Sequence, residues 1–451
     1  MRALFFVAAA LFTTLAPQIA RADGDGIDDD AYLLHHPHAR WWVSGQVNAI
    51  LQAQPGFHSP YAGANSFTPD DHAQLSIVAT VYAAYELTAT TAVMIAGESA
   101  GGGGLSQALG SAGFTNLDVV RNPTLGPTPY VGRALIEQVI PLSDERVVVS
   151  RPPFNALRTL PARRIAIRAG KLSTVDSFDV SAVGTDSHLQ LMNWALANNG
   201  AYDYAADTRG YTLGAIVEYV APRWALRYGA MLMPTVANGI DYDTDVTRAR
   251  GEQLELELHA CAGGHPGIVR VLGYLNHAKM GNYDEAIAAV RTGIVDVPDI
   301  TATRVAGRTK AGLALGLEQE LPHDARGFAR LGWADGKNES FAYTEVDNTL
   351  ALGADILGSA WHRKDDRVGL AAVTNGLSTP HRTYLALGGR GFLLGDGKLR
   401  YGREDIVEAY YTARAYRGVS PAIDVQVVSH PGYNVDRGPV VVGSVRLHVE
   451  I

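Results

Sequence analysis

The stretch Gln253–Ala260, QLELELHA, alternates apolar and polar residues without a break. Leu254, Leu256 and Leu258 fall on one face of an extended chain, and the polar residues between them fall on the other. A period of two is typical of a β-strand with one apolar and one hydrated face. The same pattern recurs at 310–319 and again at 441–450. The chain is therefore predicted to be all-β.

A soluble sandwich and a membrane barrel both contain such strands, but three features favour the barrel. Aromatic residues flank several strands: Tyr211 and Tyr219 bracket Leu213 and Val217 on one face, as in interfacial girdles. The opposite faces are rich in charge and glycine, which suits a hydrated lumen. Segments of about ten residues recur between turns. Because lipid forbids open sheet edges, we predict a closed transmembrane antiparallel β-barrel.

Composition narrows the choice of function. The 451 residues include 47% hydrophobic and 19% charged residues, and the formal net charge is −8. There is no basic block, which argues against nucleic acid as a partner. Cys261 is the single cysteine, which excludes an internal disulfide and a cysteine-based zinc cluster.

The N-terminus has the features of a secretory signal peptide over residues 1–22. Arg2 precedes an apolar run, and Ala20-Arg21-Ala22 forms a cleavage site, so we expect an exported chain that begins at Asp23. Residues 23–40 form an acidic, histidine-containing segment, interpreted as a solvated tail rather than a calcium loop. Pro37 interrupts its histidines, and we assign no metal ligand and no cofactor.

Two long stretches lack the alternation. Ser99–Asn122 is rich in glycine, and Leu172–Asp207 contains Trp194 and several asparagines and tyrosines. A stretch of this length is an external loop or a segment folded into the lumen. The fold class predicted here is a barrel with such loop segments folded into its lumen.

Nine short stretches then stand out, in order, between about Trp41 and the end of the sequence. They are 169–173 (AGKLS), 176–179 (DSFD), 193–195 (NWA), 202–212 (YDYAADTRGYT), 223–227 (RWALR), 342–347 (AYTEVD), 365–370 (DDRVGL), 408–411 (EAYY) and 434–439 (NVDRGP). In these residues the chain resembles the carbohydrate-selective porin (OprB) family. The resemblance places a porin domain at 41–451.

The resemblance implies a barrel of about 16 strands in the outer membrane of a Gram-negative bacterium, through which neutral sugars diffuse passively. The implied partners are the sugar, outer-membrane lipid and lipopolysaccharide, the barrel-insertion machinery, and two further copies in a homotrimer. Such barrels usually end on an aromatic residue, whereas this sequence ends on Ile451, on the apolar face of the last predicted strand.

A sugar channel needs a narrow wet passage whose groups exchange hydrogen bonds with hydroxyls and release them again. Arginine donates several bonds and stays charged, carboxylates accept, and aromatic faces lie against sugar rings. The candidates for this constriction lie on predicted lumen faces and on the second long stretch. They are Arg133, Glu137, Arg164, Arg168, Asn193, Trp194 and Asp203. The alternative is that the charged residues pair across the wall and that Trp194 is loop core.

Two other functions remain open on the sequence. Gly97–Gly101, GESAG, matches the nucleophile elbow of a secreted serine carboxylesterase with Ser99 as nucleophile. An elbow requires a helix directly after the serine, and here four glycines follow, which disfavours a helix. The second alternative is an outer-membrane barrel for polysaccharide export or adhesion.

Overall fold

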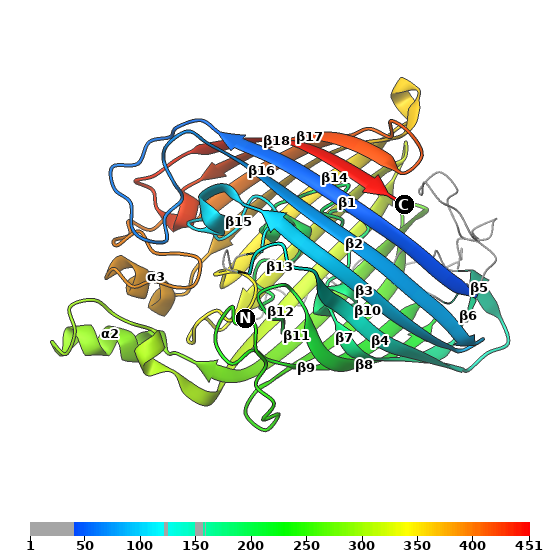
Figure 1. The fold of residues 1–451 in the computed structure, drawn as a ribbon, viewed down its shortest axis with the longest axis horizontal. Helices are drawn as coiled ribbons and strands as arrows, with labels where there is room; N and C mark the ends of the chain where they lie inside the picture. The colour runs from blue at the N-terminus through cyan, green and yellow to red at the C-terminus, as the bar shows by residue number, and fades with distance from the viewer. Residues whose placement is uncertain (1–39, 121–124, 149–156, 158) are drawn as a thin grey trace.

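The computed structural model describes residues 40–120, 125–148, 157 and 159–451. In these residues sixteen antiparallel strands form a closed barrel (Figure 1). They are β1 (Trp41–Gln54), β2 (His72–Thr88), β3 (Thr91–Gly102), β4 (Tyr130–Pro141), β7 (Arg164–Leu172), β8 (Thr212–Ala221), β9 (Trp224–Leu232), β10 (Arg250–Ala262), β11 (His265–Met280), β12 (Val305–Leu321), β13 (Ala325–Ala334), β14 (Asn348–Gly358), β15 (Arg363–Gly376), β16 (Glu404–Thr412), β17 (Val419–Ser429) and β18 (Val440–Glu450). The predicted fold class is thereby confirmed.

Each strand pairs with its neighbours in the chain, and β18 pairs with β1 to close the ring. Ile451 exchanges two backbone hydrogen bonds with Gly45, with N–O distances of 3.1 and 2.7 Å. The last residue therefore continues the pairing across the closure. Residues 1–39, which include the predicted signal peptide and almost all of the 23–40 segment, lie outside the described residues.

The alternation read in 253–260 has the predicted orientation. Leu254 is 51% exposed on the outer face, whereas Glu255 is 0% exposed inside the barrel. Trp224 and Tyr228 are also exposed on the outer face, as girdle residues should be. The prediction that Tyr211 belongs to the outer girdle is wrong. Tyr211 precedes β8, its backbone N–H donates to Asp207, and its side chain lies buried inside the barrel.

The two ends of the barrel differ. At one end, called the turn end, β1 begins and β18 ends, and short turns join most of the neighbouring strands. The hairpin of β5 (Arg146–Val148) and β6 (Thr159–Pro161) also lies at this end. At the other, the loop end, lie the long connections with α2 (Tyr283–Arg291) and α3 (Thr379–Ala386) (Figure 1). Tyr283 stacks on His381 and joins these two helices, with ring centroids 4.3 Å apart.

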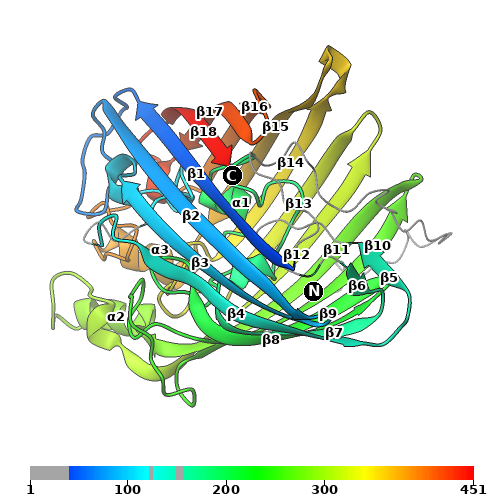
Figure 2. The ribbon, with the colours of Figure 1, turned by 45° about the vertical axis from the view of Figure 1, so that its right-hand side comes forward.

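The short helical elements are η1 (Leu105–Ala108), η2 (Thr174–Asp176), η3 (Thr301–Thr303), η4 (Ser359–Trp361), η5 (Pro431–Tyr433) and α1 (Trp194–Ala197). Of these, α1 lies among the barrel strands, as the turned view shows (Figure 2). Helix α1 belongs to the connection between β7 and β8, so this connection enters the lumen.

Candidate functional site

The connection 173–211, called here the inserted segment, folds as a small core inside the barrel. Asn193 caps the N-terminus of its helix α1, and its side chain accepts a hydrogen bond from Ala195 N. Trp194 is only 7% exposed; its ring stacks on Tyr343 with centroids 5.6 Å apart, and its Nε1 donates to the Asn116 carbonyl at 2.8 Å. The segment is therefore packed structure that narrows the lumen.

Glutamates on the barrel wall bind backbone N–H groups of the two long insertions, which are the β3–β4 loop and the inserted segment. Glu408 on β16 accepts from the N–H groups of Met192 and Asn193. Glu404, four residues earlier on the same strand, accepts from Gly113 N of the β3–β4 loop at 2.7 Å. Buried backbone N–H groups need such partners, so these contacts determine where each insertion rests.

Asp203 fixes the inserted segment to a second part of the wall, four strands from β16. Its carboxylate forms an ion pair with Lys310 on β12, with 3.0 Å between Nζ and Oδ2. It also accepts from the backbone N–H groups of Phe341 and Ala342, each at 2.8 Å. Asp203 and Lys310 are both buried, so the pair is isolated from solvent.

Opposite charges alternate around the turn-end half of the lumen in a belt that we call the charge ladder. Arg227 on β9 illustrates it: it contacts Glu218 on β8 at 2.7 Å and Glu257 on β10 at 3.2 Å. The ladder spans ten consecutive barrel strands from β4 to β15. Its members are Glu137, Arg164, Arg168, Glu218, Arg227, Glu255, Glu257, Arg270, Glu318, Arg326, Asp355 and Arg367.

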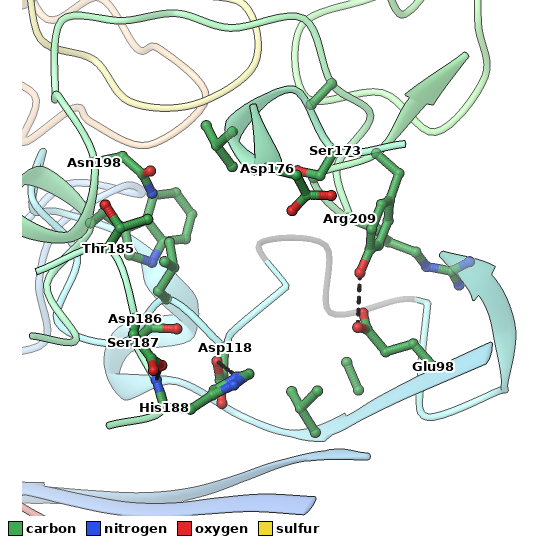
Figure 3. A pocket seen from close by; sticks show the side chains of 18 of the residues that line it. Glu98, Asp118, Ser173, Asp176, Thr185, Asp186, Ser187, His188, Asn198 and Arg209 are labelled. Atoms are coloured by element: carbon green, nitrogen blue, oxygen red, sulfur yellow. Dashed lines mark hydrogen bonds and ion pairs between the residues drawn. The ribbon is translucent and has the colours of Figure 1, made fainter. Parts of the chain in front are cut away.

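A cavity of about 710 Å³ remains between the inserted segment and the wall formed by β18 and β1–β4. Figure 3 shows Glu98, Asp176 and Arg209 on one side of it and Asp118, Asp186 and His188 on the other. A smaller cavity of about 140 Å³, lined by the glycines 101–104, adjoins it. Tyr130, Arg209 and Asp118 line both, so these three residues lie where the two spaces meet.

Glu98 on β3 is the centre of a hydrogen-bond network on one side of the cavity. It accepts from the hydroxyls of Tyr211, at 2.8 Å, and Tyr130. The Arg209 guanidinium lies over the Tyr130 ring, 4.0 Å from its centroid, and that of Arg133 lies 5.0 Å from the centroid of Tyr211. Two aromatic rings, a carboxylate and two guanidinium groups therefore share one side of the cavity.

Arg133 is itself held by a bidentate ion pair with Asp176 of η2, with N–O distances of 2.7 and 2.8 Å. Such a pair fixes the plane of the guanidinium. Asp176 belongs to the inserted segment, so the pair also joins that segment to β4. Arg133 thus presents its side chain to the cavity in one orientation.

On the other side, His188 forms an ion pair with Asp118, 3.1 Å between Nε2 and Oδ1. Burial by itself lowers the pKa of His188, but the Asp118 carboxylate outweighs burial and raises this pKa to about 9. His188 is therefore protonated at neutral pH. Its ring also stacks on His448 of β18, with centroids 5.3 Å apart.

The structure separates the seven candidate residues into three groups. Arg133 and Trp194 line the cavity. Glu137, Arg164 and Arg168 belong to the charge ladder; the Arg168–Glu137 ion pair is 2.9 Å long. Asn193 and Asp203 are buried and make their hydrogen bonds within and around the inserted segment.

Six residues that line the cavity were not predicted from the sequence to lie in the lumen: Glu98, Tyr130, Arg209, Tyr211, Asp118 and His188. One signal was available for Glu98, because the alternation along β3 places it on the same face as the buried Ala92, Met94 and Ala96. No local pattern marks Asp118 or His188, whose contact joins two separate insertions. Such a contact depends on how the insertions pack.

Ser99, the nucleophile of the esterase alternative, lies within β3 and not at a strand-to-helix turn. Its hydroxyl donates to the Pro127 carbonyl at 2.7 Å. In the part of the chain that the structure describes, no set of three His, Cys, Asp or Glu residues is arranged to hold a metal ion. No helix there has the length and apolar character needed to cross a membrane.

A closed sixteen-stranded barrel with an apolar outer face, a charged lumen and an inserted segment that narrows it defines a porin, a channel rather than an enzyme. The chain belongs to the carbohydrate-selective porin OprB family, whose model matches residues 64–451. Porins of this family are outer-membrane proteins. No curated protein matches the chain.

Among solved structures, the chain is similar to OprB of Pseudomonas putida at high pH, with a TM-score of 0.69 and 14% identity over 91% of this chain and 94% of that one. The low-pH structure of the same protein matches with a TM-score of 0.49 and 11% identity, over 91% and 92%. At these identities the likeness concerns the fold.

Proposed function

We propose that the chain is a passive diffusion channel for neutral sugars of mono- or small oligosaccharide size. The observation that carries the proposal is the 710 Å³ cavity, which lies between the inserted segment and the wall and is lined by aromatic, guanidinium and carboxylate groups. Its volume falls in the range of small-molecule sites. Rings can lie against the apolar face of a sugar, while Arg133 donates to hydroxyls and Glu98 accepts from them.

The other candidate residues have different parts in this proposal. Trp194 contributes to the cavity wall, and Asn193 and Asp203 hold the inserted segment in place. Glu137, Arg164 and Arg168 lie further along the passage: Glu137 is four residues closer to the turn end than Arg133 on β4, a distance of about 13 Å in an extended strand. The ladder offers donors and acceptors in turn, so a sugar can exchange hydrogen bonds as it advances.

The barrel also has a proposed orientation and proposed contacts in the outer membrane. The turn end faces the periplasm and the loop end faces outward, as in barrels of this class. The exposed leucines and valines of the outer face contact outer-membrane lipid. A homotrimer and assembly by the barrel-insertion machinery remain predictions. The inserted segment, folded across the lumen, argues against a wide channel for polysaccharide export.

Sugar entry into this cavity is testable by blocking an ion current. Purified protein in a planar bilayer should conduct KCl, and glucose should reduce the current in a saturable manner. Arg133→Gln should weaken the block, whereas Arg163→Gln, an exposed arginine at the turn end, should leave it unchanged. A conducting channel whose current glucose never reduces would contradict the assignment of this cavity.

A further inference from the structure

Glu98 differs from the other carboxylates of the barrel wall in the nature of its partners. Its hydrogen-bond donors are three hydroxyls, those of Tyr130, Tyr211 and Thr80. No Lys, Arg or His among the described residues forms an ion pair with it within 4.0 Å, although it lines the cavity and is only half-buried. No direct ion pair within the described part of the chain therefore cancels its charge, while its hydroxyl donors fix its orientation.

Both phenols donate to Glu98, and the Tyr211 hydroxyl also accepts from Arg133 Nη1 at 3.3 Å. Burial raises the pKa of Tyr211 well above its ordinary value, so this hydroxyl keeps its proton. A neutral hydroxyl orients a carboxylate without cancelling its charge, whereas a guanidinium would neutralise it. Figure 3 shows the Glu98 carboxylate turned towards the cavity with one such hydrogen bond drawn.

The rest of the cavity does not compensate for this charge. Its described lining has six carboxylates against two arginines and the protonated His188: Glu98, Asp118, Asp176, Asp186, Asp207 and Glu450 against Arg133 and Arg209. Arg133 is paired with Asp176 and His188 with Asp118, so these four charges cancel. The remaining excess is negative.

The charge ladder adds little to this balance. It holds six carboxylates and six arginines, and the sign of the charge changes from each strand to the next, so its charges compensate one another. Like charges along a narrow passage exclude ions of the same sign. The sign of the excess in the cavity therefore decides which ions enter.

We propose that this channel selects solutes by charge, favouring cations over anions, and that Glu98 is the residue that determines the selectivity. The proposal rests on the cavity being the conduction path proposed above. For sugars it assigns an order: an amino sugar with an ammonium group passes faster than a neutral sugar of the same size, and a sugar acid passes more slowly.

The test is the reversal potential of the channel in a planar bilayer under a KCl gradient. We expect a potential of the sign that cation flux produces. Glu98→Gln should reduce the ratio of K⁺ to Cl⁻ permeability at least about twofold, because it removes one charge at short range in a narrow passage. Glutamine has the same shape, but only its Oε1 accepts from a phenol; its NH2 donates, so the other phenol must turn its hydroxyl to accept. Heat-modifiable gel mobility will show whether the variant forms a folded barrel.

The matched control is Asp284→Asn, which removes one carboxylate from the exposed face of α2 at the loop end. It should leave the permeability ratio unchanged. An anion-selective or unselective wild-type channel would overturn the proposal. A folded Glu98→Gln variant with the wild-type ratio would remove Glu98 from it.

These outcomes are separable from failure of the sugar proposal. The reversal potential is measured without sugar, so an unselective channel leaves sugar passage untouched. Conversely, a cation-selective channel whose current glucose never blocks would retain the charge selectivity and contradict only the sugar function. Rates for glucosamine, glucose and glucuronate in liposomes then test the order of sugars directly.

Discussion

His188 of the inserted segment forms an ion pair with Asp118 of the β3–β4 loop, and these two residues belong to insertions separated by two barrel strands. Asp118 also accepts from Asn48 on β1, so the contact joins both insertions to the wall beside the cavity. The shape of the passage therefore depends on this link.

The link should depend on pH. The pKa of His188 is raised to about 9 in the folded protein, above its ordinary value of 6.5. The stabilisation that protonated His188 provides through this ion pair is thus complete below pH 6.5 and is lost as pH rises through 9. At acid pH the limit is set by Asp118. Burial raises the pKa of its carboxyl, but His188 outweighs burial and lowers this pKa below its ordinary value. The stabilisation by the ion pair is therefore lost only as pH falls through that lowered pKa.

Current noise measures this dependence. We expect a quiet open channel at pH 7 and larger fluctuations at pH 10, when the insertions are no longer joined. Asp118→Asn should bring the fluctuations to neutral pH and cost about 1–3 kcal/mol, between the values for exposed and buried ion pairs. Equal noise in wild type and variant at both pH values would show that the link does not hold the insertions.

Removing Lys310 should destabilise the inserted segment strongly. Lys310→Met leaves the buried Asp203 carboxylate without its cation, and breaking such a pair costs about 3–5 kcal/mol. Thermal unfolding in detergent measures the loss. Adding Asp203→Asn should recover part of it, because the uncompensated charge is then gone. A double variant as unstable as the sum of both single variants would mean that the two residues act independently.

The ladder prediction concerns Arg164 and Arg168 on β7. Replacing both by alanine removes two long side chains from the lumen wall and leaves Glu137 without its 2.9 Å partner. Single-channel conductance should increase and sugar discrimination should decrease. Arg163→Ala, the exposed neighbour, serves as the control. Conductance and selectivity equal to those of the wild type would place Arg164 and Arg168 outside the constriction.

Two substitutions of Trp194 separate its role in packing the inserted segment from a role in contacting sugar. Trp194→Ala removes the stack on Tyr343 and should cost about 3–5 kcal/mol. Trp194→Phe keeps an aromatic ring but loses the Nε1 hydrogen bond to Asn116, about 1 kcal/mol, and the packing of the larger indole. If Trp194 contacts sugar through its face, the Phe variant retains glucose block. Near-complete loss of block in a Phe variant that still forms a folded barrel would contradict a role for the ring face alone.

The strands were predictable because lipid and water act on opposite faces of each one. Alternation alone indicates the environments of Leu254 and Glu255, and the alternation at 310–319 places Lys310 on the polar face, which is the lumen side. The rule failed at Tyr211, where the chain leaves the strand and alternation no longer says where a side chain lies.

The inserted segments could not be predicted in the same way. Their position depends on contacts such as Glu408 with Asn193, more than two hundred residues apart, which no local pattern specifies. Asp203 could be placed in a long segment, but its role as a buried anchor follows only from the meeting with Lys310. The sequence thus indicated which segments enter the lumen, but it did not indicate which residues of the barrel wall they contact.

Liposome swelling tests the central claim most directly. Refolded protein in liposomes should admit glucose quickly and a disaccharide more slowly, while glucuronate of similar size should enter far more slowly than glucose. Equal entry of all three would reduce the protein to a general diffusion pore. No entry of either neutral sugar, from protein shown to be inserted, would contradict the proposed sugar channel.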